Sequence, residues 1–386
     1  MKYDVIIVGA GPAGLTAARI ISKKGFRVAV FEKERRLGVK LCGEAVSKRT
    51  LEEAFCTLPK DITVQDIKQA AVYAPNGNKV ILEEWGGEGY ILNKKLFLQC
   101  LAEKAVEAGI DILMNQKVVD LKRKDGLGIV KTRRGEWTSS LILGADGFTS
   151  IVSKKFGFEK KRKRELISCL QYVMVNCNLS NPQIIRFYLG RSVAPLGYVW
   201  IFPKGEKKAN VGIGMRGTPA KPYLDKFIRE HPNIFSKAQI IGIEAAPVTI
   251  SGLLDKIVDD NVMLIGEAAG QVIPLTGGGI HASMAGGRTA GETAIEALEK
   301  EDLSKNILTG YVENYQKHWG KRIRDSLKAL RVLEKLEDEE LNKLAEMLTQ
   351  QDILDLANGI NITRVGRKFM KHPLFSLKLA KALLTS

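Results

Sequence analysis

The sequence predicts a mixed α/β fold in which a parallel-sheet domain is interleaved with an antiparallel sheet and followed by C-terminal helices. Three observations predict it. A short apolar strand at residues 3–8 runs through a glycine-rich turn into a helix, as parallel α/β domains require. Residues 166–215 are rich in short alternating strands, which is typical of an antiparallel sheet. From residue 303 onward the pattern is helical.

The first unit of the chain is a strand, a turn, a helix and a second strand. The apolar strand at residues 3–8 precedes a predicted helix over residues 12–24, and Gly25 is placed to cap the end of that helix. The second strand follows over residues 27–31 and ends at Glu32. This order is the context in which a glycine-rich turn binds a dinucleotide, so we expect a Rossmann-like domain here.

Four residues of this unit suit a dinucleotide for separate reasons. Gly9 allows the tight turn out of the strand, Gly11 lets a pyrophosphate approach the backbone, and Gly14 lets the helix pack closely on the strand. The phosphates would then lie at a helix N-terminus, which favours anions. The Glu32 carboxylate is placed to accept hydrogen bonds from ribose hydroxyls and disfavours a 2′-phosphate. The turn therefore predicts NAD or FAD and does not choose between them.

The remaining elements alternate between the two kinds of sheet. A helix is predicted over residues 93–108, and several short strands follow over residues 110–144. A buried strand at residues 262–265 and a long helix over residues 280–298 come later. No repeat or low-complexity linker separates these elements, so we expect the domains to be interleaved. The predicted domains are a nucleotide-binding domain at 1–66, 85–165 and 252–302, a substrate-binding antiparallel domain at 67–84 and 166–251, and a helical region at 303–386.

Composition narrows the class of protein. The net charge of +16 leaves three explanations, which are a solvated surface, attraction to nucleic acid and attraction to anionic lipid. The five Cys are scattered without a CxxC pair, so we expect no zinc or iron–sulfur site, and this usage fits a reducing cytoplasm. No run approaches the roughly 18 apolar residues of a membrane-spanning helix, so none is expected.

Two later segments distinguish between NAD and FAD as the cofactor. An apolar strand enters residues 144–147 (Gly-Ala-Asp-Gly), and a second one enters residues 266–270 (Gly-Glu-Ala-Ala-Gly). Both segments resemble motifs of the p-hydroxybenzoate-hydroxylase-like flavoproteins, which implies FAD. Glu267 stands where that family usually has Asp. The glycines at 277–279 open a helix whose free N–H groups would face the flavin and stabilise its reduced state.

A third segment narrows the substrate. Residues 195–203 read Pro-Leu-Gly-Tyr-Val-Trp-Ile-Phe-Pro, so three aromatic residues alternate and share one face of a strand. Taken alone, this pattern is typical of a core strand. Together with residues 40–44 (Lys-Leu-Cys-Gly-Glu) and residues 270–280, it resembles the geranylgeranyl reductase family, in particular the archaeal digeranylgeranylglycerophospholipid reductases. The resemblance implies FAD-dependent saturation of C=C bonds of geranylgeranyl chains in ether-lipid precursors.

The resemblance also implies residue roles. Cys42, Tyr198 and Trp200 are the expected catalytic residues. The expected substrate contacts are Tyr198, Trp200, Phe202 and Arg322. The implied cofactor-binding residues are Gly9, Gly11, Ala13, Gly14, Glu32, Lys33, Cys42, Gly43, Ala45, Lys94, Val118, Asp146, Gly266, Glu267, Gly278, Gly279 and Ile280.

Several steps of the implied reaction stay open. Saturating an isolated alkene takes a hydride from the flavin and a proton, and the proton donor is Cys42, Tyr198 or an ordered water. The electrons come from transiently bound NAD(P)H or from a reduced ferredoxin docked on the basic surface. No second fingerprint for a nicotinamide cofactor occurs. Lys94 stands where the family commonly has Arg, so we expect a looser contact with the cofactor.

Three other functions fit parts of the sequence. A flavin-dependent aromatic monooxygenase or halogenase shares the FAD motifs but would activate O₂. A quinone-linked electron-transfer flavoprotein would carry an iron–sulfur cluster, which the Cys spacing does not supply. A basic flavoprotein that binds nucleic acid would use the net charge. The pattern at residues 195–203 favours the reductase, and we expect no nucleic-acid partner.

The C-terminal region mixes cations with apolar residues. Residues 319–328 and 364–384 both do so, and Pro373 divides the second segment into two short predicted helices. A basic amphipathic end is typical of membrane-surface contact or of a head-group clamp, and a solvated helix packed on the body is the alternative. We therefore expect a cytoplasmic protein, peripheral at the inner face of the cell membrane, with an isoprenoid lipid substrate and an electron-donor partner.

Overall fold

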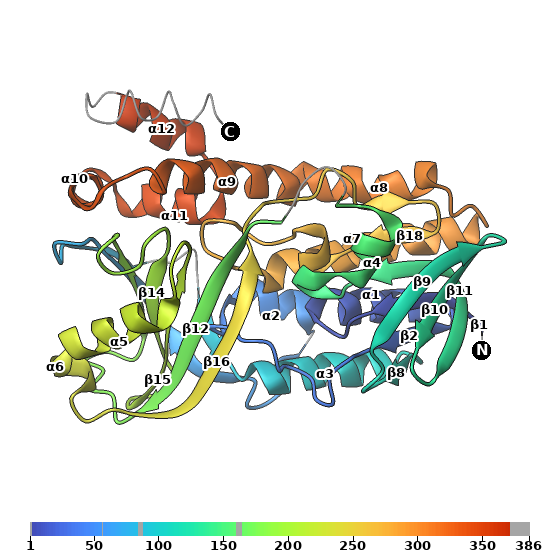
Figure 1. Cartoon of the computed structure of the whole chain (residues 1–386), viewed down its shortest axis with the longest axis horizontal. Coiled ribbons are helices and arrows are strands. Elements are labelled where there is room, and N and C mark those ends of the chain that lie inside the picture. Colours follow the sequence, from blue (N-terminus) through green and yellow to red (C-terminus); the bar gives the residue numbers. More distant parts are fainter. Residues whose placement is uncertain (1, 56, 84–87, 160–163, 371–386) are drawn as a thin grey trace.

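The computed structural model describes residues 2–55, 57–83, 88–159 and 164–370. It has an eight-stranded sheet, a seven-stranded sheet and a series of C-terminal helices. Figure 1 shows the two sheets side by side, with a layer of helices along one side of both. The predicted mixed α/β fold class is confirmed.

The eight-stranded sheet is mostly parallel. Its strands are β1 (Lys2–Val8), β2 (Val28–Phe31), β8 (Asp111–Leu113), β9 (Val118–Lys124), β10 (Leu127–Thr132), β11 (Gly135–Gly144), β17 (Val258–Asp259) and β18 (Val262–Leu264). The order β17-β18-β11-β1-β2-β8 is parallel from β18 to β8, while β10 and β9 extend antiparallel from β11. The central strands are buried and apolar because helices cover a parallel sheet.

Two helices pack closely beside this sheet. Helix α1 (Pro12–Ser22) follows β1, and α7 (Ile280–Glu299) lies against it. A Cβ at Gly287 would lie 2.3 Å from the Ala13 carbonyl oxygen, so the contact requires a residue without a side chain there. The small residues of α7 therefore set how closely the two helices approach.

Shorter elements complete the first half of the chain. Helix α3 (Lys94–Val106) also packs on α1, and α2 (Lys48–Ala54) packs on α7. Helix α4 (Ile151–Phe156) follows β11. A small antiparallel sheet consists of β3 (Ala45–Ser47), β7 (Gly89–Leu92) and β4 (Thr63–Ile67).

The seven-stranded sheet is antiparallel except for one parallel pair, β5 with β13. Its strands, in spatial order, are β16 (Gln239–Thr249), β12 (Leu166–Val175), β15 (Lys208–Met215), β14 (Tyr198–Pro203), β13 (Ile184–Leu189), β5 (Gln69–Tyr73) and β6 (Lys79–Leu82). Alternate residues of β14 face opposite ways, so Val199 and Ile201 pack in one core and Trp200 and Phe202 in another.

Two helices within this part of the chain were not predicted from the sequence. Helices α5 (Ala220–Glu230) and α6 (Pro232–Phe235) cover the sheet face that carries Val199 and Ile201. In α5 only Leu224 and Phe227 are fully buried. The apolar stripe of α5 is thus narrow. For this reason its helical periodicity is not evident in the sequence, where strand-rich segments surround it.

The C-terminal helices follow one another closely. They are α8 (Lys305–Tyr315), a π-helical turn (Gln316–Gly320), α9 (Lys321–Leu333), α10 (Asp338–Met347), α11 (Gln350–Asn358) and α12 (Ile362–Met370). Helices α8 and α9 run end to end in Figure 1. Within residues 2–370, apart from the gaps given above, no helix is long and apolar enough to cross a membrane. The predicted break at Pro373 and residues 371–386 lie outside the described residues.

The predicted helices agree with the observed ones except at their ends. The helix expected over residues 12–24 is α1, and Gly25 adopts a left-handed φ of 88° after it, as the cap predicts. The helix expected over residues 93–108 is α3, whose first turn is capped by Asn93, because its side chain accepts a hydrogen bond from the Leu96 N–H at 3.2 Å. Both helix ends are determined by residues adjacent in the sequence, so they could be predicted from it.

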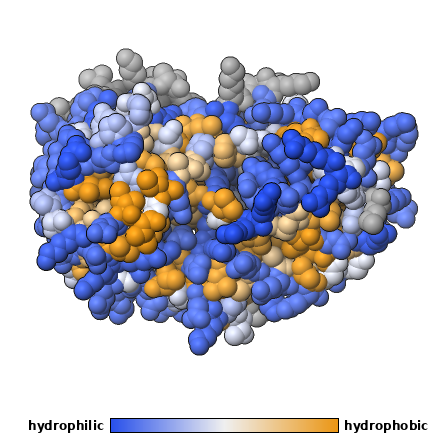
Figure 2. Space-filling model, turned by 60° about the horizontal axis from the view of Figure 1, so that its bottom comes forward, coloured by the Kyte–Doolittle hydropathy of each residue, from blue (hydrophilic) through white to orange (hydrophobic). Residues whose placement is uncertain are grey.

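Apolar side chains on the surface are dispersed rather than collected in one region. Figure 2 shows several apolar patches separated by hydrophilic side chains on the face it presents. The edge strand β16 exposes three isoleucines, Ile240, Ile241 and Ile243, which are 46%, 60% and 64% exposed. Such an edge is where a sheet leaves backbone groups unpaired.

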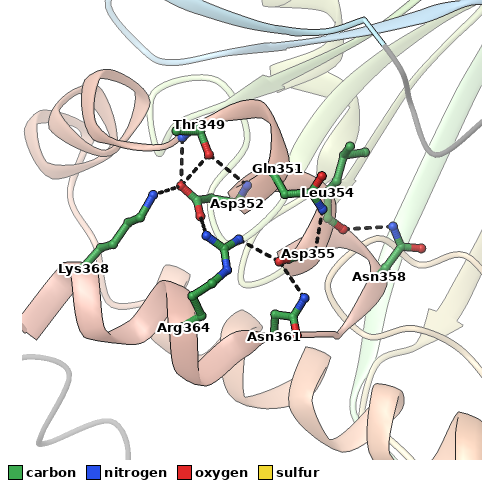
Figure 3. Close-up of polar contacts among 9 residues, drawn as sticks. All are labelled: Thr349, Gln351, Asp352, Leu354, Asp355, Asn358, Asn361, Arg364 and Lys368. Carbon is green, nitrogen blue, oxygen red and sulfur yellow. Dashed lines mark hydrogen bonds and ion pairs between the residues drawn. The ribbon is translucent and has the colours of Figure 1, made fainter.

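Two buried carboxylates join α11 to α12. The side chains of Asp352 and Asp355 are 0% and 1% exposed. Arg364 of α12 pairs with both at 2.7 Å, and Lys368 pairs with Asp352 (Figure 3). Asp352 also accepts hydrogen bonds from the N–H and hydroxyl of Thr349, which cap α11. These bonds hold the pKa of Asp352 down, at about 2, against the opposing effect of burial.

We expect Asp352→Asn to lower the free energy of unfolding by about 2 kcal/mol at pH 7, because Arg364 and Lys368 lose a buried ionised partner. The native pKa lies below the unfolded value of about 3.9, so this contribution is present above pH ~4 and disappears as the pH falls towards 2. Urea unfolding at pH 7 and at pH 3 measures it. Glu296→Gln, which removes an exposed i,i+4 pair with Lys300, is the control and should change little. An equal loss at both pH values would contradict the prediction.

Candidate active site

The predicted site residues line one large cavity. Its volume is about 1670 Å³, and it extends from the carboxyl ends of the parallel strands to the seven-stranded sheet and the helices α9 to α11. Gly14 is the exception among the predicted residues, because a Cβ there would lie 2.1 Å from the Gly9 carbonyl oxygen and it faces the turn instead. Gly14 therefore has the predicted packing role, and its contact with a cofactor stays a prediction.

The N-terminus of α1 opens into the cavity. A Cβ at Gly11 would meet no heavy atom within 4 Å, so the backbone of this turn borders free space. Nearby, the Glu32 carboxylate accepts hydrogen bonds from the N–H groups of Ala10 and Glu34, both at 2.9 Å. These bonds fix the carboxylate and leave lone pairs for a further donor. The predicted residues on this part of the wall are Gly9, Gly11, Ala13, Glu32, Lys33 and Val118.

Asp146 follows β11 and presents an unsatisfied oxygen. Its Oδ2 accepts hydrogen bonds from the N–H groups of Ile151 at 2.7 Å and Val152 at 3.2 Å. Its Oδ1 is buried without a hydrogen-bond partner. Burial raises the pKa of Asp146, and the hydrogen bonds oppose this effect. This oxygen is therefore available to accept a hydrogen bond from a bound ligand.

Glu267 lies in a short 3₁₀ turn, η2 (Gly266–Ala269), beside Asp146. Its Oε1 accepts a hydrogen bond from the Thr249 N–H at 3.0 Å, and its Oε2 pairs with Lys40. Both oxygens thus have protein partners already. A shorter Asp at this position would not reach as far, so the substitution noted in the sequence explains the ion pair with Lys40. A cofactor contact of Glu267 stays a prediction.

The glycine-rich turn before α7 lies against the aromatic strand. Gly278, Gly279 and Ile280 line the cavity where α7 begins. The Tyr198 hydroxyl donates a hydrogen bond to the Thr276 carbonyl oxygen at 2.5 Å. Burial raises the pKa of Tyr198, so its phenol is protonated at neutral pH. The free N–H groups of a helix N-terminus and the aromatic wall therefore face the same space.

Strand β14 supplies the aromatic wall. Tyr198, Trp200 and Phe202 all line the cavity, which confirms that they share one face of a strand. Successive ring centroids are 6.0 Å and 6.2 Å apart. Phe187 from β13 packs edge-on against Tyr198 at 5.6 Å and against Phe202 at 5.4 Å. Phe187 escaped the sequence analysis because the pairing of β13 with β14 brings it to this wall.

Two thiols border the same part of the cavity. The Cys42 sulfur accepts a hydrogen bond from the Glu44 N–H at 3.3 Å. Cys169 on β12 also lines the cavity and was not singled out from the sequence. Burial raises the pKa of Cys169 to about 12, so it stays a neutral thiol. This part of the cavity wall is thus aromatic and thiol in character.

The loop at residues 40–44 closes the cavity from the nucleotide side. Cys42, Gly43 and Ala45 line it, and a Cβ at Gly43 would lie 2.6 Å from the Phe202 ring. Lys94 at the start of α3 also lines the cavity, where its ammonium donates a hydrogen bond to the Lys40 carbonyl. Lys94 therefore supports this loop, and its predicted contact with a cofactor stays a prediction.

Arg322 lies on α9 at the helical side of the cavity. Its guanidinium lies over the Trp319 ring at 4.6 Å and donates to the carbonyl and side-chain oxygens of Asn358, both at 2.9 Å. Burial lowers the pKa of Arg322. Within the described part of the chain, no carboxylate lies within ion-pair distance of it. Arg322 is thus a positioned cation whose charge is free for an anionic ligand.

The part of the cavity beside α9 to α11 is mostly apolar, although Glu334, Gln351 and Asn358 also line it. It is lined by side chains of α9, α10 and α11, for whose apolar residues the sequence predicted no role. The leucine spacing over residues 330–356 is the signal that could have found them. The apolar lining residues from this region are Leu330, Leu333, Leu336, Leu341, Leu344, Leu348, Ile353, Leu354, Leu356 and Ile360.

Comparison with known proteins gives the family. Residues 165–248 match the geranylgeranyl reductase catalytic domain, and residues 1–139 match the Thi4 family. Digeranylgeranylglycerophospholipid reductase 2 of Methanopyrus kandleri is 34% identical over 100% of both chains. The chain belongs to the geranylgeranyl reductase family. The digeranylgeranylglycerophospholipid reductase of Methanocaldococcus jannaschii is also 34% identical, over 99% of this chain and 98% of that one.

Solved structures agree with this family. A geranylgeranyl bacteriochlorophyll reductase-like protein of Thermoplasma acidophilum has a TM-score of 0.85 and 31% identity over 99% of both chains. The flavin-dependent brominase Bmp2 has a TM-score of 0.70 with 17% identity, over 93% of this chain and 94% of that one, which shows a common fold alone. The geranylgeranyl reductase family and the flavin-dependent halogenases thus share this architecture.

The cofactor of this fold is FAD, and the wall of the cavity fits it. Three features of the wall are suited to its parts. Gly11 leaves room for a pyrophosphate at the N-terminus of α1. The orphaned Asp146 Oδ1 can accept a hydroxyl proton. The turn before α7 offers backbone N–H groups beside the aromatic strand.

We expect Gly11→Val to lower FAD affinity about tenfold or more while the fold is kept, because the added side chain fills ligand space and contacts no protein atom within 4 Å of its Cβ. Flavin absorbance of the purified protein and titration of the stripped protein measure this. Gly366→Val on α12 is the matched control, since a Cβ there is equally unobstructed. Full flavin content in the Gly11 variant would contradict the assignment of this turn.

Proposed function

We propose that this protein is an FAD-dependent reductase that saturates the C=C bonds of geranylgeranyl chains in archaeal ether-lipid precursors. One observation carries the proposal. The cavity of about 1670 Å³ joins a dinucleotide-type turn to a long apolar chamber, and the aromatic strand lies between the two. A chamber lined by the leucines of α9 to α11 is not suited to a small polar substrate, because leucine side chains offer it no hydrogen bonds. The relatives named above support the same substrate class.

Bound FAD in its reduced form would supply the hydride. The α1 turn, Glu32 and Asp146 would hold this group, and the N-terminus of α7 would favour negative charge near the flavin ring. The loop at residues 40–44 covers it from the nucleotide side. These residues therefore fix the position of the reacting ring relative to the chamber.

The aromatic wall would hold the alkene and exclude water. An unactivated alkene has no carbonyl to accept charge, so its reduction develops positive charge at carbon as the proton is added. The ring faces of Tyr198, Trp200 and Phe202 attract such charge in a dry site. Trp200 is held by its indole N–H, which donates to the Gln171 side-chain oxygen at 3.0 Å. The wall can thus stabilise the charge without moving.

A group on this wall would supply the proton. The reaction would form two C–H bonds, one from the hydride and one from a proton, and would break the C=C π bond, the bond to hydrogen in the hydride donor and the bond to hydrogen in the proton donor. Tyr198 already donates its proton to Thr276, whereas the Cys42 sulfur accepts from Glu44 and keeps its S–H free. We therefore place the proton at Cys42 Sγ, with Cys169 as a neighbouring thiol and water as the source that replaces it.

Arg322 would contact the head group of the lipid. A half-buried guanidinium without a carboxylate partner suits a phosphate, because it forms charge-assisted hydrogen bonds. The electron donor stays a choice between NAD(P)H and reduced ferredoxin, and both fit the basic chain.

The direct test is reduction of a geranylgeranyl lipid under anaerobic conditions. The dithionite-reduced protein should oxidise its flavin on adding the lipid, and mass spectrometry should find one added pair of hydrogens per reduced double bond. Protein carrying Gly11→Val, which we expect to lack the cofactor, is the control. Unchanged lipid, together with O₂-dependent hydroxylation or halogenation of an aromatic compound, would favour the monooxygenase or halogenase alternative and overturn the reductase.

We also propose that the protein lies at the membrane surface, with the basic side of α12 toward anionic lipid. The predicted cations beyond residue 370 lie outside the described residues, so the argument depends on α12. Arg364 and Lys368 pair with Asp352 and Asp355, while Arg367 is exposed. Removing α12 would therefore leave two buried carboxylates without their cationic partners, and a point substitution is the cleaner probe.

We expect Arg367→Glu to weaken binding to phosphatidylglycerol vesicles about fivefold or more, since one cation near a membrane adds ~1 kcal/mol. Vesicle sedimentation at low salt measures it, and flavin content should not change. Lys124→Glu, at the end of β9, is the control with the same change in net charge. Equal weakening by both variants would show that net charge alone attracts the protein.

A further inference from the structure

Nothing so far explains how the loop at residues 40–44 is held against the aromatic wall. The loop leaves the nucleotide-binding sheet, yet Gly43 lies against Phe202 of the other sheet. Glu44 at its end has a left-handed φ of 71°, which is unfavourable for a residue with a side chain. Such a conformation persists only where other contacts enforce it.

The Glu44 side chain makes those contacts with three different parts of the fold. Its Oε1 accepts a hydrogen bond from the Lys94 N–H in the first turn of α3 at 3.1 Å. Its Oε2 accepts one from the Asn210 amide of β15 at 2.8 Å and pairs with the Lys204 ammonium at 2.5 Å. The Glu44 and Lys204 side chains are 15% and 16% exposed. A largely buried ion pair thus joins the loop to the seven-stranded sheet.

A second set of contacts ties the same loop to Trp200. The buried Gln171 donates from its amide to the Cys42 carbonyl oxygen at 3.2 Å and accepts from the Trp200 indole at 3.0 Å. Trp200 itself fits over Gly212, where a Cβ would lie 2.2 Å from the indole. The backbone of Cys42 and the ring of Trp200 are therefore linked through one side chain.

We propose that Glu44, through its ion pair with Lys204, is a positioning residue that fixes the Cys42–Gly43 segment against the aromatic wall. This inference rests on the proposed function, since it holds that one contact sets the distance between the cofactor and the alkene. Glu44 touches neither in this role. Its effect is on alignment, because displacing a reacting group by about 1 Å can lower the rate of the reaction ~100-fold.

The test compares Glu44→Gln, Lys204→Met and the double variant. Each should keep FAD and the fold, yet slow reoxidation of the reduced flavin by the lipid about 10–100-fold. Reoxidation by ferricyanide, which needs no alkene alignment, should not change. The double variant should be no slower than the single ones, because one contact is lost in all three. Additive losses, or equal slowing with ferricyanide, would overturn the inference.

A readout independent of turnover separates this inference from the proposed function. Hydrogen–deuterium exchange of the peptide containing residues 40–44 should rise in the Glu44 and Lys204 variants with and without FAD. Glu165→Gln breaks an ion pair with Arg216 and Arg331 elsewhere and should leave this peptide unchanged. If the wild-type protein does not reduce the lipid, the proposed function fails. Hydrogen–deuterium exchange still tests whether Glu44 and Lys204 hold the loop at residues 40–44. Unchanged hydrogen–deuterium exchange in the Glu44 variant would refute the positioning role of Glu44, whatever the substrate is.

Discussion

The site depends on one constraint, which is that three strands far apart in the sequence end at the same edge of a parallel sheet. The Ala145 N–H donates to the Val8 carbonyl at 2.8 Å, and the Ile265 N–H donates to the Gly144 carbonyl at 2.9 Å. The turns after β1, β11 and β18 are thereby side by side. Gly9 must be glycine here, because a Cβ would lie 2.4 Å from the Ala145 carbonyl oxygen. Register between strands thus converts three weak motifs into one binding surface.

The second sheet gives this surface its chemistry. A parallel sheet edge alone recognises a nucleotide and says nothing about a substrate. Strand β14 adds an aromatic face on the side toward the cavity, while its alternate residues, Val199 and Ile201, bury themselves against α5 and α6. Helices α9 to α11 then close the chamber with leucines. This leucine-lined part of the cavity suits an extended hydrocarbon, because a hydrocarbon needs no hydrogen-bond partners when it is buried.

The sequence predicted what local spacing determines and missed what tertiary pairing determines. The Gly9 turn, the acid at Asp146 and the alternation around Trp200 each follow from a few adjacent residues, and the cavity contains all three. Phe187 and Cys169 come to the same wall only because β13 and β12 take particular places in the sheet. The order of strands, with β15 between β12 and β14, depends on long-range contacts that no local pattern encodes.

Two departures from the family pattern meet at one residue, Lys40. Glu267 stands where the family usually has Asp, and its longer side chain reaches the Lys40 ammonium. Lys94 stands where the family commonly has Arg, and its ammonium holds the Lys40 carbonyl. A shorter acid would not reach Lys40, and a planar guanidinium would present a different set of donors to that carbonyl. Glu267 and Lys94 therefore hold the same residue of the loop, one through the Lys40 side chain and the other through its backbone.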